Sequence, residues 1–193
     1  MKKTFLFIII VSYSINSLAQ KKNKKTITSI SKTVITQTDG ISVEAIKNNF
    51  YVLFNNGLSK DTLSKTVGNK QTDCKIIPFN AKTNKLYLVS WIEKNTTQTA
   101  TKTEDKTLTY SEIFDTNSKS KVFSNIQTST KIKEQVFLDK LKNASETQER
   151  TRNEGFVVTI LPDGDLSLKT KTQENKMTFD LVAKKYIDAK KRK

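Results

Sequence analysis

The sequence predicts a mainly β protein with one helix, built as an antiparallel meander that forms a sandwich or a partly open barrel. Three observations predict this class. Short segments of alternating apolar and polar residues, rich in threonine, valine, isoleucine and aromatic residues, are typical of strands. Turn signals such as Pro162-Asp163-Gly164 separate these segments. One stretch, residues 131–148, has the period of an amphipathic helix.

The first part of the chain is expected to contain two strands and a short helix. The β-branched residues 26–37 predict a strand that ends at the Asp39-Gly40 turn. Residues 41–48 predict a short helix, since their apolar side chains fall loosely on one side. Residues 50–54 are apolar in both phases, so both faces of that strand should be covered. The polar residues 55–72 predict a long loop.

A hairpin is expected next, with arms at 74–79 and 85–94. Residues 86–92 are again apolar on both faces, and Pro78 favours an edge or a bulge because it cannot donate to a ladder. The threonine-rich residues 94–109 predict a hairpin that projects beyond the core and turns near Glu104-Asp105.

Two further strands, at about 107–115 and 120–129, should meet at Asn117-Ser118. Residues 131–148 then predict the one helix. Thr130 is a possible N-cap of this helix, because its hydroxyl could accept a hydrogen bond from the first turn. The apolar face of the helix would consist of Phe137, Leu138, Leu141 and Ala144.

The clearest hairpin of the sequence comes after the helix. Residues 155–161 and 165–172 alternate on either side of Pro162-Asp163-Gly164, a combination that favours a tight turn. A last strand is expected at about 176–183, before the basic C-terminal residues.

The N-terminus predicts a secretory signal peptide over residues 1–19. Lys2 and Lys3 precede the uninterrupted apolar run 5–11, and Ser17-Leu18-Ala19 places small residues where a signal peptidase reads them. The apolar run is much shorter than the roughly 20 residues that a membrane-spanning helix needs. We therefore expect an exported protein, periplasmic or extracellular and not membrane-spanning. The lysine, asparagine and isoleucine content favours a bacterial source.

The positive charge is concentrated at the two ends of the expected mature chain. A single β-rich domain is expected at 26–183, between a basic tail at 20–25 and another at 184–193. Of the formal net charge of +15, these tails contribute +4 and +5. Outside the cytoplasm, basic tails would meet an anionic envelope surface or glycan rather than a specific nucleic acid. The candidate polyanion contacts are Lys21, Lys22, Lys24, Lys25, Lys190, Lys191, Arg192 and Lys193.

The residue types exclude several kinds of chemistry. The chain has no histidine, which removes the usual general base, the serine-histidine and cysteine-histidine pairs and the commonest transition-metal ligand. Cys74 is the only cysteine, and its apolar neighbours favour a small buried side chain over a reactive thiol. Asp163-Gly164-Asp165 is too short a set of oxygen ligands for a calcium loop and is better explained as a turn. No catalytic residue, metal ligand or cofactor is predicted.

Two weaker patterns concern ligands and catalysis. Glycoside hydrolysis would need a pair of carboxyl groups, and the acids available near one hairpin alternate with lysines in a way typical of solvated surfaces. These acids are Glu93, Glu104, Asp105, Glu112 and Asp115. Trp91 is the ligand-contact candidate, because a strand that is apolar on both faces could leave one face open to a ligand.

Three functions remain after these exclusions. We expect first an exported, non-catalytic envelope or secreted protein that acts as a binding or structural module. The first alternative is a carrier of an apolar small molecule in a β-barrel, which would need a connected internal cavity. The second is a carboxylate-dependent hydrolase, which would need two buried carboxyl groups facing each other in a cleft.

Export leads to the first testable prediction. Protein purified from its native host should begin at Gln20, or within a residue or two of it, because the residues before it have the order of a cleavable signal peptide. Intact-mass measurement checks this directly. A soluble product that retains residues 1–19 would contradict the prediction.

Overall fold

The computed structural model describes residues 32–68 and 70–189, and they are nearly all antiparallel β structure. Strands make up 73% of these residues and helix 1%, in three sheets of which none closes into a barrel. The predicted mainly β, antiparallel class is confirmed, and the arrangement is consistent with a sandwich. The helix predicted at 131–148 is wrong, because residues 131–137 belong to a strand.

The N-terminal sheet has the order β1-β2-β3-β4, each strand antiparallel to the next. Its bounds are β1 Lys32–Thr38, β2 Ile41–Ile46, β3 Asn49–Asn55 and β4 Lys60–Val67. The short helix expected at 41–48 is wrong: Ile41 and Val43 are buried on β2, which pairs with a strand on each side. The loop expected at 55–72 contains β4, because Leu63 packs against the core between polar neighbours.

The central sheet is a five-stranded meander in the order β5-β6-β7-β8-β9. Its bounds are β5 Thr72–Ala81, β6 Asn84–Gln98, β7 Lys102–Asp115, β8 Ser120–Phe137 and β9 Ser145–Glu154. The expected hairpin with arms at 74–79 and 85–94 is present as β5 and β6, and Pro78 lies on β5, an edge strand of this sheet.

The C-terminal sheet has the order β10-β11-β12-β13. Its bounds are β10 Val157–Ile160, β11 Leu166–Lys169, β12 Glu174–Asp180 and β13 Lys185–Asp188. The Pro162-Asp163-Gly164 turn joins β10 to β11 as predicted. Strand β13 falls within the range assigned to the basic C-terminal tail; its Tyr186 is buried and donates a hydrogen bond to the Gly164 carbonyl oxygen at 2.8 Å.

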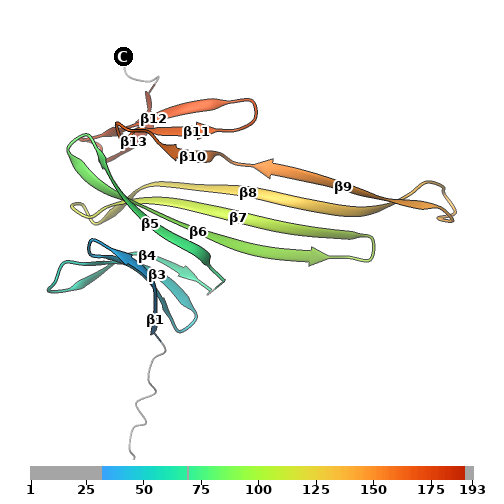
Figure 1. The fold of residues 1–193 in the computed structure, drawn as a ribbon, viewed down its shortest axis with the longest axis horizontal. Helices are drawn as coiled ribbons and strands as arrows, with labels where there is room; N and C mark the ends of the chain where they lie inside the picture. The colour runs from blue at the N-terminus through green and yellow to red at the C-terminus, as the bar shows by residue number, and fades with distance from the viewer. Residues whose placement is uncertain (1–31, 69, 190–193) are drawn as a thin grey trace, which may run out of the picture.

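The three sheets lie in layers, with the central sheet between the other two (Figure 1). Side chains alternate along β6, so its two faces enter different cores. Tyr87, Val89 and Trp91 pack against Ile41, Val43, Phe50 and Val52 of the N-terminal sheet. Leu86 and Leu88 pack against Leu166, Phe179 and Tyr186 of the C-terminal sheet. The apolar character predicted for both faces of residues 86–92 is thereby explained.

Strands β6 to β9 continue beyond the two outer sheets as a long projecting ribbon, which we call the arm (Figure 1). The projecting hairpin expected within 94–109 is part of the arm, but it turns at Thr99–Thr101 and not near Glu104-Asp105. The register explains this position, because Gln98 pairs with Thr103 and Asp105 lies opposite Thr96. The Thr96 hydroxyl donates to the Asp105 carboxylate at 2.7 Å.

The helix predicted at 131–148 is replaced by the end of β8, a loop and the start of β9. An amphipathic helix needs a surface that covers its apolar face, and the arm lies outside both cores. The alternation of Thr128, Thr130 and Ile132, all three buried, instead continues a strand that pairs with β7 on one side and β9 on the other. Thr130, the expected N-cap, is therefore in the middle of β8.

The packing of Trp91 yields a prediction about stability. Its indole is 2% exposed, stacks on Tyr110 with ring centroids 4.9 Å apart and lies 5.0 Å from the Phe50 ring. Trp91→Ala should lower the free energy of unfolding by about 3–5 kcal/mol, because it leaves a cavity between two sheets. Leu58→Ala, at a 99% exposed position, should change it by less than about 0.5 kcal/mol. Urea denaturation measures both, and equal midpoints would contradict the assignment.

Candidate functional site

One face of the arm presents three neighbouring rows of polar side chains. Residues directly opposite each other on antiparallel strands point to the same face. Ser129 of β8 lies opposite Thr107 and Asn153, Lys131 opposite Asp105 and Thr151, and Lys133 opposite Thr103 and Glu149. By strand alternation this face is continuous with the one that the C-terminal sheet covers.

Three open pockets follow one another along this face. The first, of about 580 Å³, lies at the base of the arm beneath the β11–β12 turn, and the second and third have volumes of about 450 and 360 Å³. Lys133 lines both the second and the third, so these two adjoin. We call the series the arm groove. The central-sheet side chains that define it are Gln98, Thr103, Asp105, Gln127, Ser129, Lys131, Lys133, Gln135, Thr147, Glu149, Thr151 and Asn153.

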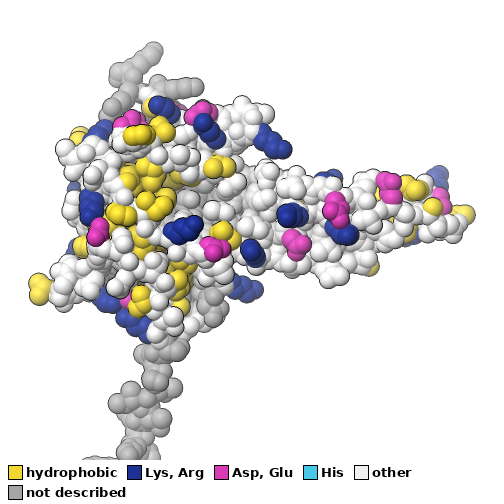
Figure 2. All heavy atoms as spheres, viewed as in Figure 1, with side chains coloured by type: hydrophobic (Ala, Val, Ile, Leu, Met, Phe, Trp, Pro, Cys, Tyr) yellow, Lys and Arg dark blue, Asp and Glu magenta, His cyan; other side chains and the backbone are white. Residues whose placement is uncertain are grey.

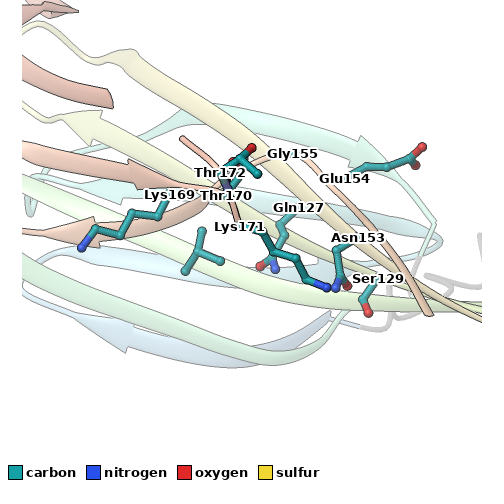
Figure 3. Close-up of a pocket in the computed structure, with 10 residues that line it drawn as sticks. Gln127, Ser129, Asn153, Glu154, Gly155, Lys169, Thr170, Lys171 and Thr172 are labelled. Atoms are coloured by element: carbon teal, nitrogen blue, oxygen red, sulfur yellow. Dashed lines mark hydrogen bonds between the residues drawn. The ribbon is translucent and has the colours of Figure 1, made fainter. Parts of the chain in front are cut away.

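The base of the arm groove is closed on one side by the β11–β12 turn, residues 170–173. Thr170 orders this turn: its hydroxyl oxygen accepts hydrogen bonds from the backbone N–H groups of Thr172 at 3.3 Å and Gln173 at 3.1 Å. Figure 3 shows Lys171 extending from the turn toward Asn153 and Ser129, whereas Glu154 points away from them. The turn thus places an ammonium group above the row of small polar side chains.

The lining of the arm groove is polar and carries more positive than negative charge. Lys131, Lys133 and Lys171 lie on the groove face against Asp105 and Glu149, whereas Lys102, Arg150 and Glu154 border the pockets from positions that face the other side of the arm. Lys133 lies 3.2 Å from Glu149, an exposed pair of small energetic worth. Within the described residues, Lys131 and Lys171 make no ion pair, so their charges are available to a ligand.

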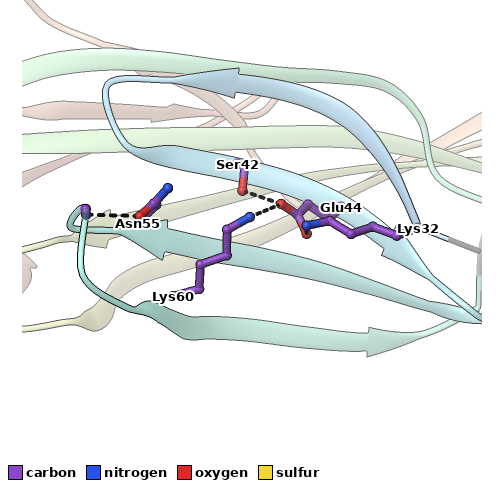
Figure 4. A network of polar contacts seen from close by, with 6 residues as sticks. Lys32, Ser42, Glu44, Asn55 and Lys60 are labelled. Atoms are coloured by element: carbon purple, nitrogen blue, oxygen red, sulfur yellow. Dashed lines mark hydrogen bonds and ion pairs between the residues drawn. The ribbon is translucent and has the colours of Figure 1, made fainter. Parts of the chain in front are cut away.

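A second polar cluster lies in the N-terminal sheet around Glu44 (Figure 4). The Glu44 side chain is 1% exposed, and its oxygens lie 2.8 Å from Lys60 Nζ, 2.9 Å from Lys32 Nζ and 3.1 Å from Ser42 Oγ. Burial tends to raise the pKa of Glu44, but the hydrogen bonds from Lys60, Lys32 and Ser42 outweigh it and hold the pKa below its ordinary value. The carboxylate therefore ties β1, β2 and β4 together as an ion, which is unsuitable for a general acid.

The acids considered for hydrolysis are engaged in separate local contacts. Asp105 and Glu104 are neighbours on β7 and so point to opposite faces of the arm. Buried Glu112 binds Lys121 at 2.7 Å, and buried Asp115 accepts hydrogen bonds from Asn117 N–H and Ser118 Oγ. Glu93 accepts from the Trp91 indole at 3.3 Å and from Gln71 at 2.9 Å.

Trp91 and Cys74 both belong to the core between the N-terminal and central sheets. Trp91, the ligand-contact candidate, is enclosed there and lines none of the pockets described above. Cys74 is half-buried against the same cluster. Burial, together with the charge of Asp73, raises the pKa of the Cys74 thiol to about 11, which leaves little of the reactive thiolate at neutral pH.

The tail lysines 21, 22, 24, 25, 190, 191 and 193 and Arg192 lie outside the described residues. In the ranges 32–68 and 70–189, no three Cys, Asp or Glu side chains gather as a metal site would require. The same ranges contain no helix with the length and hydrophobicity of a membrane span. Asp163-Gly164-Asp165 forms a turn in which Asp165 N–H donates to the Asp163 carboxylate at 3.0 Å.

No model of a known protein family, no curated protein and no solved structure matches this chain. The geometry of the arm and its groove is therefore the basis on which a function is proposed. The sequence pattern does not reveal this groove, because residues 131–148, which include Lys131 and Lys133, predict a helix. The signal that could have found it is the β-branched alternation of residues 128–132, which continues the preceding strand.

The Glu44 cluster predicts a pH dependence of stability. A lowered pKa in the folded state means that the carboxylate stabilises the fold above its ordinary pKa of 4.5 and loses this effect as the pH falls through the folded value. At about pH 7, Glu44→Gln should lower the free energy of unfolding by about 1–3 kcal/mol, because charged hydrogen bonds are lost. This difference from the parent chain should shrink below pH 4.5.

Urea denaturation at several pH values measures the effect, with Glu149→Gln as the control. Glu149 also pairs with a lysine, but both side chains of that pair are largely exposed, so little change is expected at any pH. A Glu44→Gln deficit that stays constant from neutral to acidic pH would contradict the role assigned to the carboxylate.

Proposed function

We propose that this chain is an exported, non-catalytic binding module and that its arm groove holds an extended anionic glycan. The observation that carries the proposal is the series of three polar pockets along one face of the arm, with Lys131 and Lys171 lacking ion-pair partners among the described residues. The expected export, and with it a glycan of the cell envelope or its surroundings, comes from the N-terminal sequence.

The shape of the groove supports an extended ligand. Its lining residues on β8 run from Gln127 to Gln135, eight residues apart, which corresponds to about 27 Å along a strand. All three pockets are open to solvent rather than enclosed by the sheets. A flexible polymer that lies along the strands fits this geometry better than a compact small molecule in a barrel.

The chemistry of the lining supports an anionic, hydroxyl-rich ligand. Serine, threonine, asparagine and glutamine side chains can both donate and accept hydrogen bonds, which suits sugar hydroxyls. The lysines add ammonium groups for carboxylate or sulfate groups, and the positive excess attracts a polyanion over a longer range. The lining has no aromatic ring on which a nucleic acid base could stack, which favours a glycan over single-stranded nucleic acid.

The proposal of a non-catalytic role draws support from the acids and from the composition. The buried carboxylates Glu44, Glu112 and Asp115 each have a local structural partner. With no histidine and a thiol of raised pKa, the chain offers few groups tuned for proton transfer or nucleophilic attack. The tail lysines would add attraction without selecting an orientation.

Charge reversal in the groove tests the proposal. Lys131→Glu/Lys171→Glu should weaken binding to a heparin oligosaccharide by about tenfold or more at low ionic strength, because both ammonium groups face the same ligand path. Lys75→Glu/Lys106→Glu makes the same change in net charge at exposed positions outside the groove and should have a much smaller effect. Calorimetric titration measures the affinities, and circular dichroism verifies the fold.

Two outcomes would contradict the groove as the binding surface. An equal loss in both double variants would mean that net charge alone governs binding. Binding that disappears on removal of residues 20–25 and 190–193, yet is unchanged in Lys131→Glu/Lys171→Glu, would assign the contact to the tails predicted from the sequence.

A further inference from the structure

The far end of the arm exposes three large apolar side chains that are close in sequence. The arm tip, residues 137–144, joins β8 to β9. Phe137 is 36% exposed, Leu138 63% and Leu141 81%. None of them belongs to either hydrophobic core, and none lines a pocket of the arm groove. These are the residues that gave the sequence its apparent helical face, and their apolar surface is left in contact with water.

The arm tip is ordered by hydrogen bonds within the loop, and its leucine side chains take no part in these contacts. Leu138 N–H donates to the Ala144 carbonyl at 2.9 Å and closes the loop. The Asp139 carboxylate accepts hydrogen bonds from the backbone N–H groups of Asn143 at 2.9 Å and Ala144 at 3.2 Å. The loop therefore holds its shape without burying Leu138 or Leu141, and both side chains remain available to a partner.

The loop carries two lysines against one acid, and Glu146 follows at the start of β9. Lys140 and Lys142 are exposed, and the Lys142 ammonium lies 5.3 Å from the centroid of the Phe137 ring. The one acid of the loop, Asp139, directs its carboxylate to backbone donors. Figure 2 shows hydrophobic side chains at the end of the arm, where basic and acidic side chains accompany them.

We infer that the arm tip inserts into the interfacial region of an anionic lipid bilayer. Apolar side chains at the extreme end, flanked by lysines, suit the boundary between acyl chains and anionic headgroups. A bilayer fits better than a folded partner, since the apolar group projects from a narrow ribbon and forms no groove. From Ile126 to Phe137, β8 spans eleven residues or about 36 Å, so the tip can reach a membrane while the layered body stays clear of it.

The inference is independent of the proposed glycan binding, because the arm tip and the arm groove use different side chains. It also offers a close control. Leu58 is a leucine on the β3–β4 turn that is 99% exposed, yet no other large exposed apolar side chain is its neighbour in sequence. Scattered single apolar residues of this kind are ordinary on protein surfaces, whereas the group at the arm tip is not.

Vesicle co-sedimentation tests the inference with the chain from Gln20 onward, which contains every described residue. On vesicles of phosphatidylcholine and phosphatidylglycerol, Leu138→Asp/Leu141→Asp should lower the partition coefficient at least about tenfold, because the apolar insertion is lost. Leu58→Asp should bind as the parent chain does. Lys140→Gln/Lys142→Gln should lose about fivefold per lysine on these vesicles and little on pure phosphatidylcholine.

A fluorescence measurement on Leu141→Trp gives a second reading that involves no loss of function. The natural Trp91 is buried and contributes a constant background, so a blue shift on addition of anionic vesicles reports the entry of residue 141 into the interface. The absence of any shift would overturn the inference.

Two other results would also overturn it. Equal sedimentation of Leu138→Asp/Leu141→Asp and Leu58→Asp would mean that the terminal lysines or the arm groove hold the vesicle. A dimer that dissociates in Leu138→Asp/Leu141→Asp, without any change in vesicle binding, would make a second copy of the chain the occupant of the arm tip.

Discussion

Burial of the central sheet on both faces is the constraint on which the architecture depends. Five apolar side chains of β6 enter the two cores, Tyr87, Val89 and Trp91 on one face and Leu86 and Leu88 on the other, so a single covering sheet would leave one of these sets in water. Two outer sheets meet this demand, one from each end of the chain. Gly164, in the β10–β11 turn, shows how closely the C-terminal sheet approaches the central sheet. It has φ +82°, and a Cβ atom there would collide with the Asn80 carbonyl oxygen of β5. The C-terminal sheet is therefore fitted against β5 at backbone level.

The arm is formed by the same strands where no outer sheet covers them. Where the outer sheets end, β6 to β9 lose their apolar cover, and their side chains change to threonine, serine, glutamine and charged residues. Ladder pairing with neighbouring strands keeps them extended. Every residue of the edge strand β9 is exposed, and its Glu146, Glu149, Arg150, Arg152 and Glu154 obstruct pairing with a strand of another molecule. The arm groove is a product of this polar ribbon together with the β11–β12 turn that covers its base.

The sequence allowed the class of fold to be predicted but not the partition into sheets. Residues 86–92 and the Pro162-Asp163-Gly164 turn carry strong local signals, and both were interpreted correctly. The segment 131–148 misled because Phe137, Leu138 and Leu141 cluster in sequence at a loop, which imitates the face of a helix. Tyr186 was assigned to the basic tail, because the lysines around it in sequence give the segment a polar character although its ring is buried. The arm groove depends on which residues lie opposite each other across three strands. That register cannot be derived from the amino-acid sequence of one protein alone.

The three sheets are also three consecutive stretches of the chain, and neighbouring strands within each sheet are neighbours in sequence. Each hairpin can therefore close over a short loop, at a small entropic cost, without waiting for distant residues. The N-terminal sheet has all of its strands before the central sheet begins, and β6 can acquire its first cover before β10 to β13 arrive. A chain that emerges gradually, N-terminus first, can build this molecule in the order in which it appears, with the last four strands closing the second face.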